Sequence, residues 1–212
     1  MKYCGPDLAR DQKTALILAI MSTLVIHPAD QSTDFLKQIY ATIKNKTVIT
    51  GGVTKYELHE IIITHERVLM FGHGCPNGLF SIGQFPDSGA YIIDESTVKY
   101  LDNKSNNVFI WCHANLFTLR FGLAGFYSGM FISEVGEAMY LSMCCIDWHQ
   151  INESNEQFAS ITSKYIDQPL DVLYENVIHE YGKVAETNPI AKYNLNRLFL
   201  NKNAHHSVVS TL

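Results

Sequence analysis

Positive charge is scarce in this sequence, and it is not clustered. The 212 residues include 16 Lys and Arg against 21 Asp and Glu, which gives a formal net charge of −5. Binding to nucleic acid draws much of its affinity from clustered Lys and Arg that release counterions from the phosphate backbone. We therefore expect no nucleic-acid partner.

A long apolar run is also missing. The longest one near the start, residues 15–26, is interrupted by Ser22 and Thr23 and is too short to cross a hydrocarbon layer of roughly 30 Å. Residues 7–13 carry charges of both signs, unlike the basic start of a secretory signal peptide. The sequence thus predicts a cytoplasmic protein with no membrane partner.

Cysteines are few, and their number is odd. They are Cys4, Cys75, Cys112, Cys144 and Cys145. With 47% hydrophobic residues, a chain of this length can bury one substantial core without disulfide cross-links. We expect all five to be thiols, one of which can serve as a nucleophile. The adjacent pair near residue 145 is interpreted as structural and buried.

The length of the chain predicts one domain rather than two. Residues 21–200 are expected to form a single α/β domain. Residues 1–20 are either an extension upstream of that domain or an additional packed helix, and both alternatives stay open. The polar tail, residues 201–212, is expected to be flexible.

Short β-branched or apolar runs alternate with amphipathic segments along the first half of the chain. This alternation is typical of a mostly parallel sheet with helices on both faces, a three-layer α/β sandwich. Strands are predicted at residues 24–26, 47–50, 68–71, 108–111 and 129–133. Helices are predicted at residues 34–44, 55–63, 134–143, 155–167 and 169–184. In such sheets the chemistry lies at the carboxyl ends of the strands.

Two of the predicted strands end in side chains that carry chemistry. His73 follows the strand at 68–71, and Cys112 follows the strand at 108–111. The chain between them is long enough for the crossover that joins neighbouring parallel strands. A thiol attacks a carbonyl as its thiolate, and histidine is its usual base. His73 and Cys112 are therefore predicted to form a catalytic pair at one edge of the sheet.

Gly74 has a separate place in this prediction. Because glycine has no Cβ, a substrate can approach the backbone closely at this position. The N–H of Gly74 is then free to point at a developing oxyanion, and the N–H of Cys112 is the expected second donor.

The motifs occur in a fixed order. They are VLMFGHG at 68–74, a glycine-rich hairpin at 78–83, YIIDES at 91–96 and VFIWCHA at 108–114. This order resembles that of the caspase-like cysteine peptidases, which include caspases, metacaspases, legumains and gingipains. In that group one strand ends in His-Gly and the next core strand ends in the nucleophilic cysteine. Cys112 followed by His113 is most similar to the metacaspases.

The resemblance covers residues 22–145 and implies both a fold and an activity. The implied fold is the caspase-like three-layer sandwich. The implied activity is hydrolysis of a polypeptide substrate through a Cys-His dyad and a thioester, with no metal and no other cofactor. The sequence carries no signal for the oligomeric state.

The resemblance also implies where the substrate binds. In relatives specific for basic residues, acidic side chains after the first strand line the pocket, and Asp30 and Asp34 lie there in this sequence. Trp111 stands where the family has a small or acidic residue, directly before the cysteine. The expected substrate-binding residues are Asp30, Asp34, Trp111 and His113. A preference for Arg or Lys on the acyl side of the cleaved bond is the resulting hypothesis.

Other interpretations stay open. His73, Cys75, Cys112 and His113 have zinc-binding side chains, although their spacing does not match structural zinc sites. LVIHPAD at 24–30 resembles the first-strand motif of zinc-dependent sugar deacetylases, with alanine in place of that motif's first aspartate. A caspase-like domain that binds partners without cleaving them is the remaining alternative, and Trp111 favours it.

Overall fold

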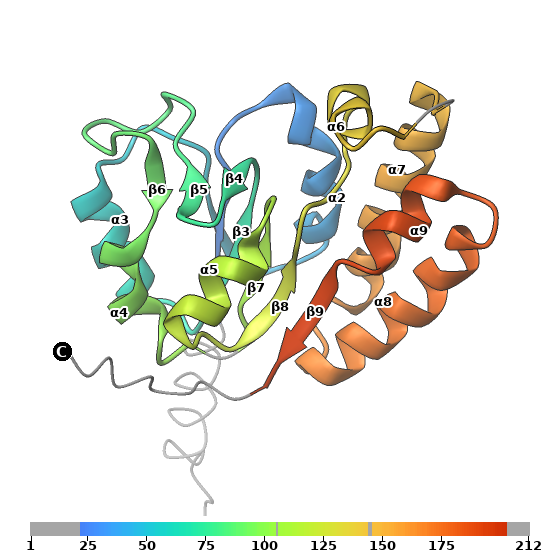
Figure 1. The fold of residues 1–212 in the computed structure, drawn as a ribbon. Helices are drawn as coiled ribbons and strands as arrows, with labels where there is room; N and C mark the ends of the chain where they lie inside the picture. The colour runs from blue at the N-terminus through green and yellow to red at the C-terminus, as the bar shows by residue number, and fades with distance from the viewer. Residues whose placement is uncertain (1–21, 105, 144–145, 203–212) are drawn as a thin grey trace, which may run out of the picture.

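The computed structural model describes residues 22–104, 106–143 and 146–202, and Figure 1 shows how they are arranged. A six-stranded sheet forms the centre. In spatial order its strands are β2 (Lys46–Ile49), β1 (Thr23–Ile26), β3 (Arg67–Phe71), β7 (Val108–Ile110), β8 (Gly125–Ser128) and β9 (Leu198–Asn201). Neighbouring strands pair in parallel except β9, which runs antiparallel to β8. The prediction of a mostly parallel α/β sheet is confirmed.

Side chains on successive strand positions enter two separate hydrophobic clusters, because strand residues alternate between the faces of a sheet. In β1, Val25 belongs to one cluster, whereas Leu24 and Ile26 belong to the other. The first cluster is covered by α2 (Lys37–Tyr40), α7 (Trp148–Tyr165) and α8 (Leu170–Ala185). The second is covered by α3 (Lys55–Ile63), α4 (Val98–Leu101) and α5 (Ala114–Phe121). Helices thus cover both faces, as predicted, and make three layers (Figure 1).

A small antiparallel sheet follows β3 directly. It consists of β4 (Gly74–Cys75), β5 (Gly78–Phe80) and β6 (Tyr91–Ile93). Gly78 allows the strands to approach, since a Cβ there would lie 1.8 Å from the carbonyl oxygen of Ile93. This sheet is the predicted glycine-rich excursion, and it fixes the backbone on either side of Gly74.

The fifth strand was predicted at 129–133 and this was wrong, because the strand is β8 and the chain leaves the sheet after Ser128. The backbone of Ile132 is satisfied by a side chain instead of a neighbouring strand. Its N–H donates to Asn194 Oδ1 at 2.7 Å, and its carbonyl accepts from Asn194 Nδ2 at 2.8 Å. An apolar run can therefore be buried without belonging to a sheet.

The helical predictions differ mainly in their boundaries. The helix predicted at 34–44 is the 3-10 helix η1 (Gln31–Leu36) followed by α2, and the helix predicted at 134–143 is the shorter α6 (Val135–Tyr140). The helix predicted at 155–167 begins earlier, since Asp147 and Gln150 form a capping box for α7.

The last elements of the chain carry no prediction of their own. These are α9 (Pro189–Leu195) and β9, which includes Asn201, a residue predicted to belong to the tail. Residues 1–20 and 203–212, to which the predictions of an extension and a flexible tail refer, lie outside the described residues. Within the ranges that the structure describes, none of the helices combines the length and the apolar character needed to cross a membrane.

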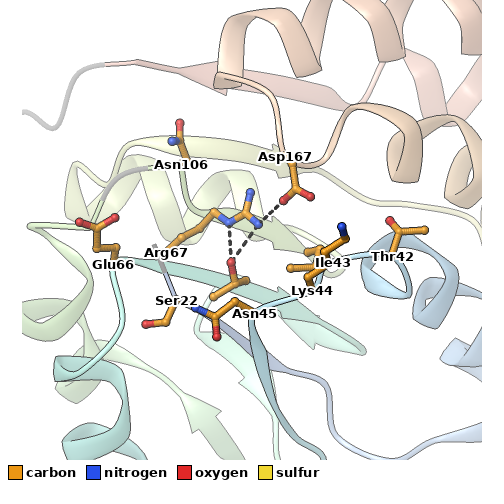
Figure 2. Close-up of a pocket in the computed structure, with 10 residues that line it drawn as sticks. Ser22, Thr42, Ile43, Lys44, Asn45, Glu66, Arg67, Asn106 and Asp167 are labelled. Carbon is orange, nitrogen blue, oxygen red and sulfur yellow. Dashed lines mark hydrogen bonds and ion pairs between the residues drawn. The ribbon is translucent and has the colours of Figure 1, made fainter. Parts of the chain in front are cut away.

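Arg67 organises the amino-terminal edge of the sheet, next to a hollow of about 340 Å³ (Figure 2). Its guanidinium donates to Thr23 Oγ1 on β1, to the carbonyl of Ile166 and to the carboxylate of Asp167. These contacts join β1 and β3 to the end of α7. The guanidinium that lines this hollow therefore has a structural role. The hollow lies at the opposite edge of the sheet from His73 and Cys112.

Candidate active site

The predicted pair lies at the carboxyl edge of two neighbouring strands. Phe71 of β3 is paired with Ile110 of β7, and His73 and Cys112 come two residues after these partners. Both side chains line one pocket, together with Phe131 and Ser133 from the segment that follows β8. The adjacency of the two strands, on which the prediction of a dyad depends, is confirmed.

The pocket between these side chains is small. Its open volume is about 20 Å³, roughly the space of one water molecule. Residues of η1, including Thr33 and Leu36, close it on one side. A polypeptide does not fit into this space, so a peptide-binding conformation requires the walls to separate.

His73 is held by a hydrogen-bonded chain that starts on η1. Asp30 accepts from the backbone N–H and from Oγ of Ser32, both at 2.9 Å, and these bonds lower the pKa of the Asp30 carboxyl. Since the Ser32 hydroxyl donates to this carboxylate, its oxygen accepts from His73 Nε2 at 2.7 Å. Asp30 Oδ2 lies 3.8 Å from the same nitrogen. The imidazole therefore carries a hydrogen on Nε2, and in its neutral form the lone pair is on Nδ1.

Cys112 makes its contacts on the other side of β7. Its Sγ lies 3.4 Å from the carbonyl oxygen of Phe131 and 3.6 Å from Glu137 Oε1 on α6. The pKa of the Cys112 thiol is raised to about 12, mainly because the thiol is buried and secondly because the negative Glu137 carboxylate lies nearby. In this conformation Cys112 is a protonated thiol that donates to oxygen acceptors.

The N–H of Gly74, the predicted oxyanion donor, is not used in pairing β4 with β5. Phe80 N–H donates to the carbonyl of His73, so His73 and Phe80 form a hydrogen-bonded pair and Gly74 with Leu79 forms a non-hydrogen-bonded one. The N–H of Gly74 therefore points away from β5. A Cβ at Gly74 would lie 2.3 Å from Trp111 Cδ1, which shows how closely the two segments pack.

We expect Gly74→Ala to destabilise the protein by about 1–3 kcal/mol, because the added methyl group overlaps Trp111 and the carbonyl of Gly78. Urea denaturation at neutral pH measures this. Gly182→Ala is the matched control, since its Cβ would meet only Leu195 at 3.9 Å, and helix propensity favours alanine there. A Gly74→Ala protein as stable as wild type would show that Trp111 does not pack as described.

The expected substrate-binding residues are not brought together as a set. Asp30 lies beside His73, as described above. Trp111 lines the pocket but is only 1% exposed, and its Nε1 donates to the carbonyl of Cys75 at 3.2 Å. Asp34 forms an ion pair with Lys37 at 2.6 Å. Trp111 is thus part of the hydrophobic core, and the carboxylates of Asp30 and Asp34 both have partners.

His113 faces a different hollow. Its backbone is left-handed, with φ of 67°, at the start of α5. It lines a space of about 410 Å³ with Leu116, Arg197 and Phe199, on the side of β8 and β9. The structure therefore separates His113 from the pocket between His73 and Cys112.

The zinc interpretations find no matching cluster of side chains. Among the residues that the structure describes, no group of three or more His, Cys, Asp and Glu side chains could hold a metal ion. His27, the histidine of the deacetylase-like motif, is buried and contacts Tyr40 Oη at 2.9 Å and Thr33 Oγ1 at 3.0 Å. Through Thr33, the His27 side chain is hydrogen-bonded to η1.

Two residues of the site were not predicted. Ser32 follows Asp30 in an Asp-x-Ser turn, which is a recognisable helix start, so this contact had a local signal. Glu137 had none, because its approach to Cys112 depends on the path of the chain after β8.

Comparisons with models of protein families, with curated proteins and with solved structures found no match. The proposal for function therefore depends on the ordered motif and on the site geometry.

Proposed function

We propose that this protein is a caspase-like cysteine peptidase, with a fold of the caspase-like type. The observation that carries the proposal is that His73 and Cys112 end neighbouring parallel strands and line one pocket. The resemblance requires this arrangement, in which His-Gly ends one core strand and the cysteine ends the next. The free thiols of Cys75 and Cys112 suit a reducing compartment, and we place the peptidase in the cytosol.

The proposed reaction uses each group in a defined role. Cys112 Sγ attacks the peptide carbonyl, while His73 Nδ1 takes the thiol proton and then gives a proton to the departing amine. The resulting thioester is hydrolysed by water, which releases the acid and restores the thiol. The N–H groups of Gly74 and Cys112 stabilise the oxyanion. The chain from Asp30 through Ser32 positions the imidazole.

Ser32→Ala should lower kcat by up to about 100-fold with KM almost unchanged, because the imidazole loses its orientation and not its chemistry. Ser32→Thr keeps a hydroxyl and should recover much of the rate. Ser96→Ala is the control, since Ser96 makes the same two bonds to Asp94 at the start of η2 (Glu95–Thr97). A normal kcat in Ser32→Ala would contradict the positioning role.

Hydrolysis of a fluorogenic peptide library that varies the acyl-side residue tests the proposed activity. The library should cover acidic, basic and apolar residues, because Asp30 and Asp34, the basis of the predicted Arg or Lys preference, are both engaged. Cleavage that depends on Cys112 supports the proposal. Hydrolysis that persists in Cys112→Ala would contradict it.

A domain that binds without cleaving is the second candidate. The small pocket and the raised pKa of Cys112 favour it. This candidate predicts no turnover of any library member by wild type or by any variant that frees the thiol. Turnover by one such variant would exclude it.

A further inference from the structure

The segment after β8 brings a carboxylate against the candidate nucleophile. It leaves the sheet after Ser128, passes Phe131 and Ser133, and enters α6, where Glu137 Oε1 lies 3.6 Å from Cys112 Sγ. Figure 1 shows α6 as a short helix beside the end of the sheet.

Glu137 is fixed in this position by three donors. Its Oε2 accepts from the N–H of Ser133 at 2.7 Å, from Ser133 Oγ at 3.1 Å and from the N–H of Glu134 at 3.1 Å. A carboxylate with three donors on one oxygen is well ordered, and its other oxygen stays directed at the thiol. The contact is therefore a built feature and not a chance position of a surface side chain.

The direction of the thiol matters for its chemistry. β7 has β3 on one side, which ends at His73, and β8 on the other, which leads to Phe131 and Glu137. The contacts of Cys112 Sγ are with Phe131 and Glu137, so the thiol leans toward the β8 side. The Glu137 carboxylate favours the protonated thiol over the thiolate, whereas the backbone of Phe131 acts on the thiol pKa in the opposite direction and more weakly.

We propose that Glu137 is an internal latch on Cys112, which keeps the thiol protonated and directed away from His73 until the segment 131–137 moves. The consequence for peptide cleavage rests on the proposed function, whereas the effect on thiol reactivity does not. The latch also accounts for the small pocket, since Phe131 and Ser133 form one of its walls. Opening requires new partners for the thiol and for the N–H of Ser133.

Alkylation by iodoacetamide tests the latch without any peptide substrate. The full chain is treated at pH 7.5, and mass spectrometry follows the modification of Cys112 relative to Cys75 in the same molecules. Glu137→Gln removes the charge and keeps an acceptor for the N–H of Ser133, while Glu137→Ala removes the contact. We expect the ratio of Cys112 to Cys75 rates to rise about tenfold in Glu137→Gln and further in Glu137→Ala, because a thiol pKa lower by one unit gives tenfold more thiolate.

Glu134→Gln is the matched comparison, since it removes the same charge one turn away, where the carboxylate raises the Cys112 pKa less than Glu137 does, and it should raise the ratio less than Glu137→Gln. General loosening of the fold would raise the rates of both cysteines, whereas loss of the latch should raise the rate of Cys112 and leave that of Cys75 unchanged. If Glu137→Gln does not fold, Ser133→Ala can be used instead. It removes the hydroxyl that holds the Glu137 carboxylate in place, and it should also raise the ratio. An unchanged ratio in the folded variants would overturn the latch.

Peptide cleavage separates this proposal from the proposed function. A raised ratio without cleavage by any variant would support the latch and defeat the peptidase. Cleavage by wild type with an unchanged ratio would support the peptidase and defeat the latch.

Discussion

Replacing Cys112 by alanine should reduce peptide cleavage by about 1000-fold or more and leave the fold intact, because no other group in the proposed reaction can form the thioester. The variant loses one thiol and its two contacts at the end of β7, while the hydrophobic clusters are untouched. Initial rates of peptide hydrolysis, together with circular dichroism and the Tm, measure both parts of the expectation.

His73→Ala should lose nearly as much activity, since it removes the only imidazole in the pocket among the described residues. Cys75→Ala is the matched control, because Cys75 is also a partly exposed free thiol and lies on the neighbouring hairpin. Its activity should remain close to that of wild type. Equal losses in Cys75→Ala and Cys112→Ala would contradict the assigned roles.

Acid should destabilise the protein by protonating His27, which is buried and contacts Thr33 of η1. Burial lowers the pKa of His27 from 6.5 to about 4, and the neutral ring contacts Tyr40 and Thr33. Because the folded pKa is depressed, this stabilisation is complete above pH 6.5 and is lost as the pH falls toward 4. The linked loss is about 3 kcal/mol over that interval.

Urea denaturation at several pH values measures this loss. His27→Gln should be less stable than wild type at pH 7, but its stability should depend much less on pH between 6.5 and 4. His179→Gln, at an exposed position on α8, should keep the wild-type pH dependence. The same dependence in His27→Gln as in wild type would show that another group is responsible. Since Thr33 belongs to η1, acid should also disturb Asp30 and Ser32 and lower activity.

The sequence predicts the part of the site that depends on the strands. Apolar runs of strand length, each followed by a reactive side chain, place His73 and Cys112 at one edge as soon as the sheet is parallel. The pattern of burial on both faces is equally readable, because Val25 and its neighbours are all apolar. These features follow from local composition and from the geometry of parallel sheets.

The remaining features depend on contacts between distant segments. The run that contains Ile132 has the composition of a strand, but the side chain of Asn194, far along the chain, takes both hydrogen bonds of the Ile132 backbone. The position of Glu137 beside Cys112 has the same origin. Trp111 was predicted to contact substrate, but its packing against Phe109 and Phe117 appears only when α5 is in place.

The most direct test of the central claim is covalent capture by a peptide-based electrophile. An acyloxymethyl ketone on a mixture of short peptides is incubated with the full chain, and mass spectrometry identifies the modified residue. Because the bond is irreversible, product accumulates even if the latched site opens rarely. The account predicts modification at Cys112 that is lost in His73→Ala and faster in Glu137→Gln. Modification of a different cysteine, or labelling of Cys112 at the same rate without His73, would contradict it.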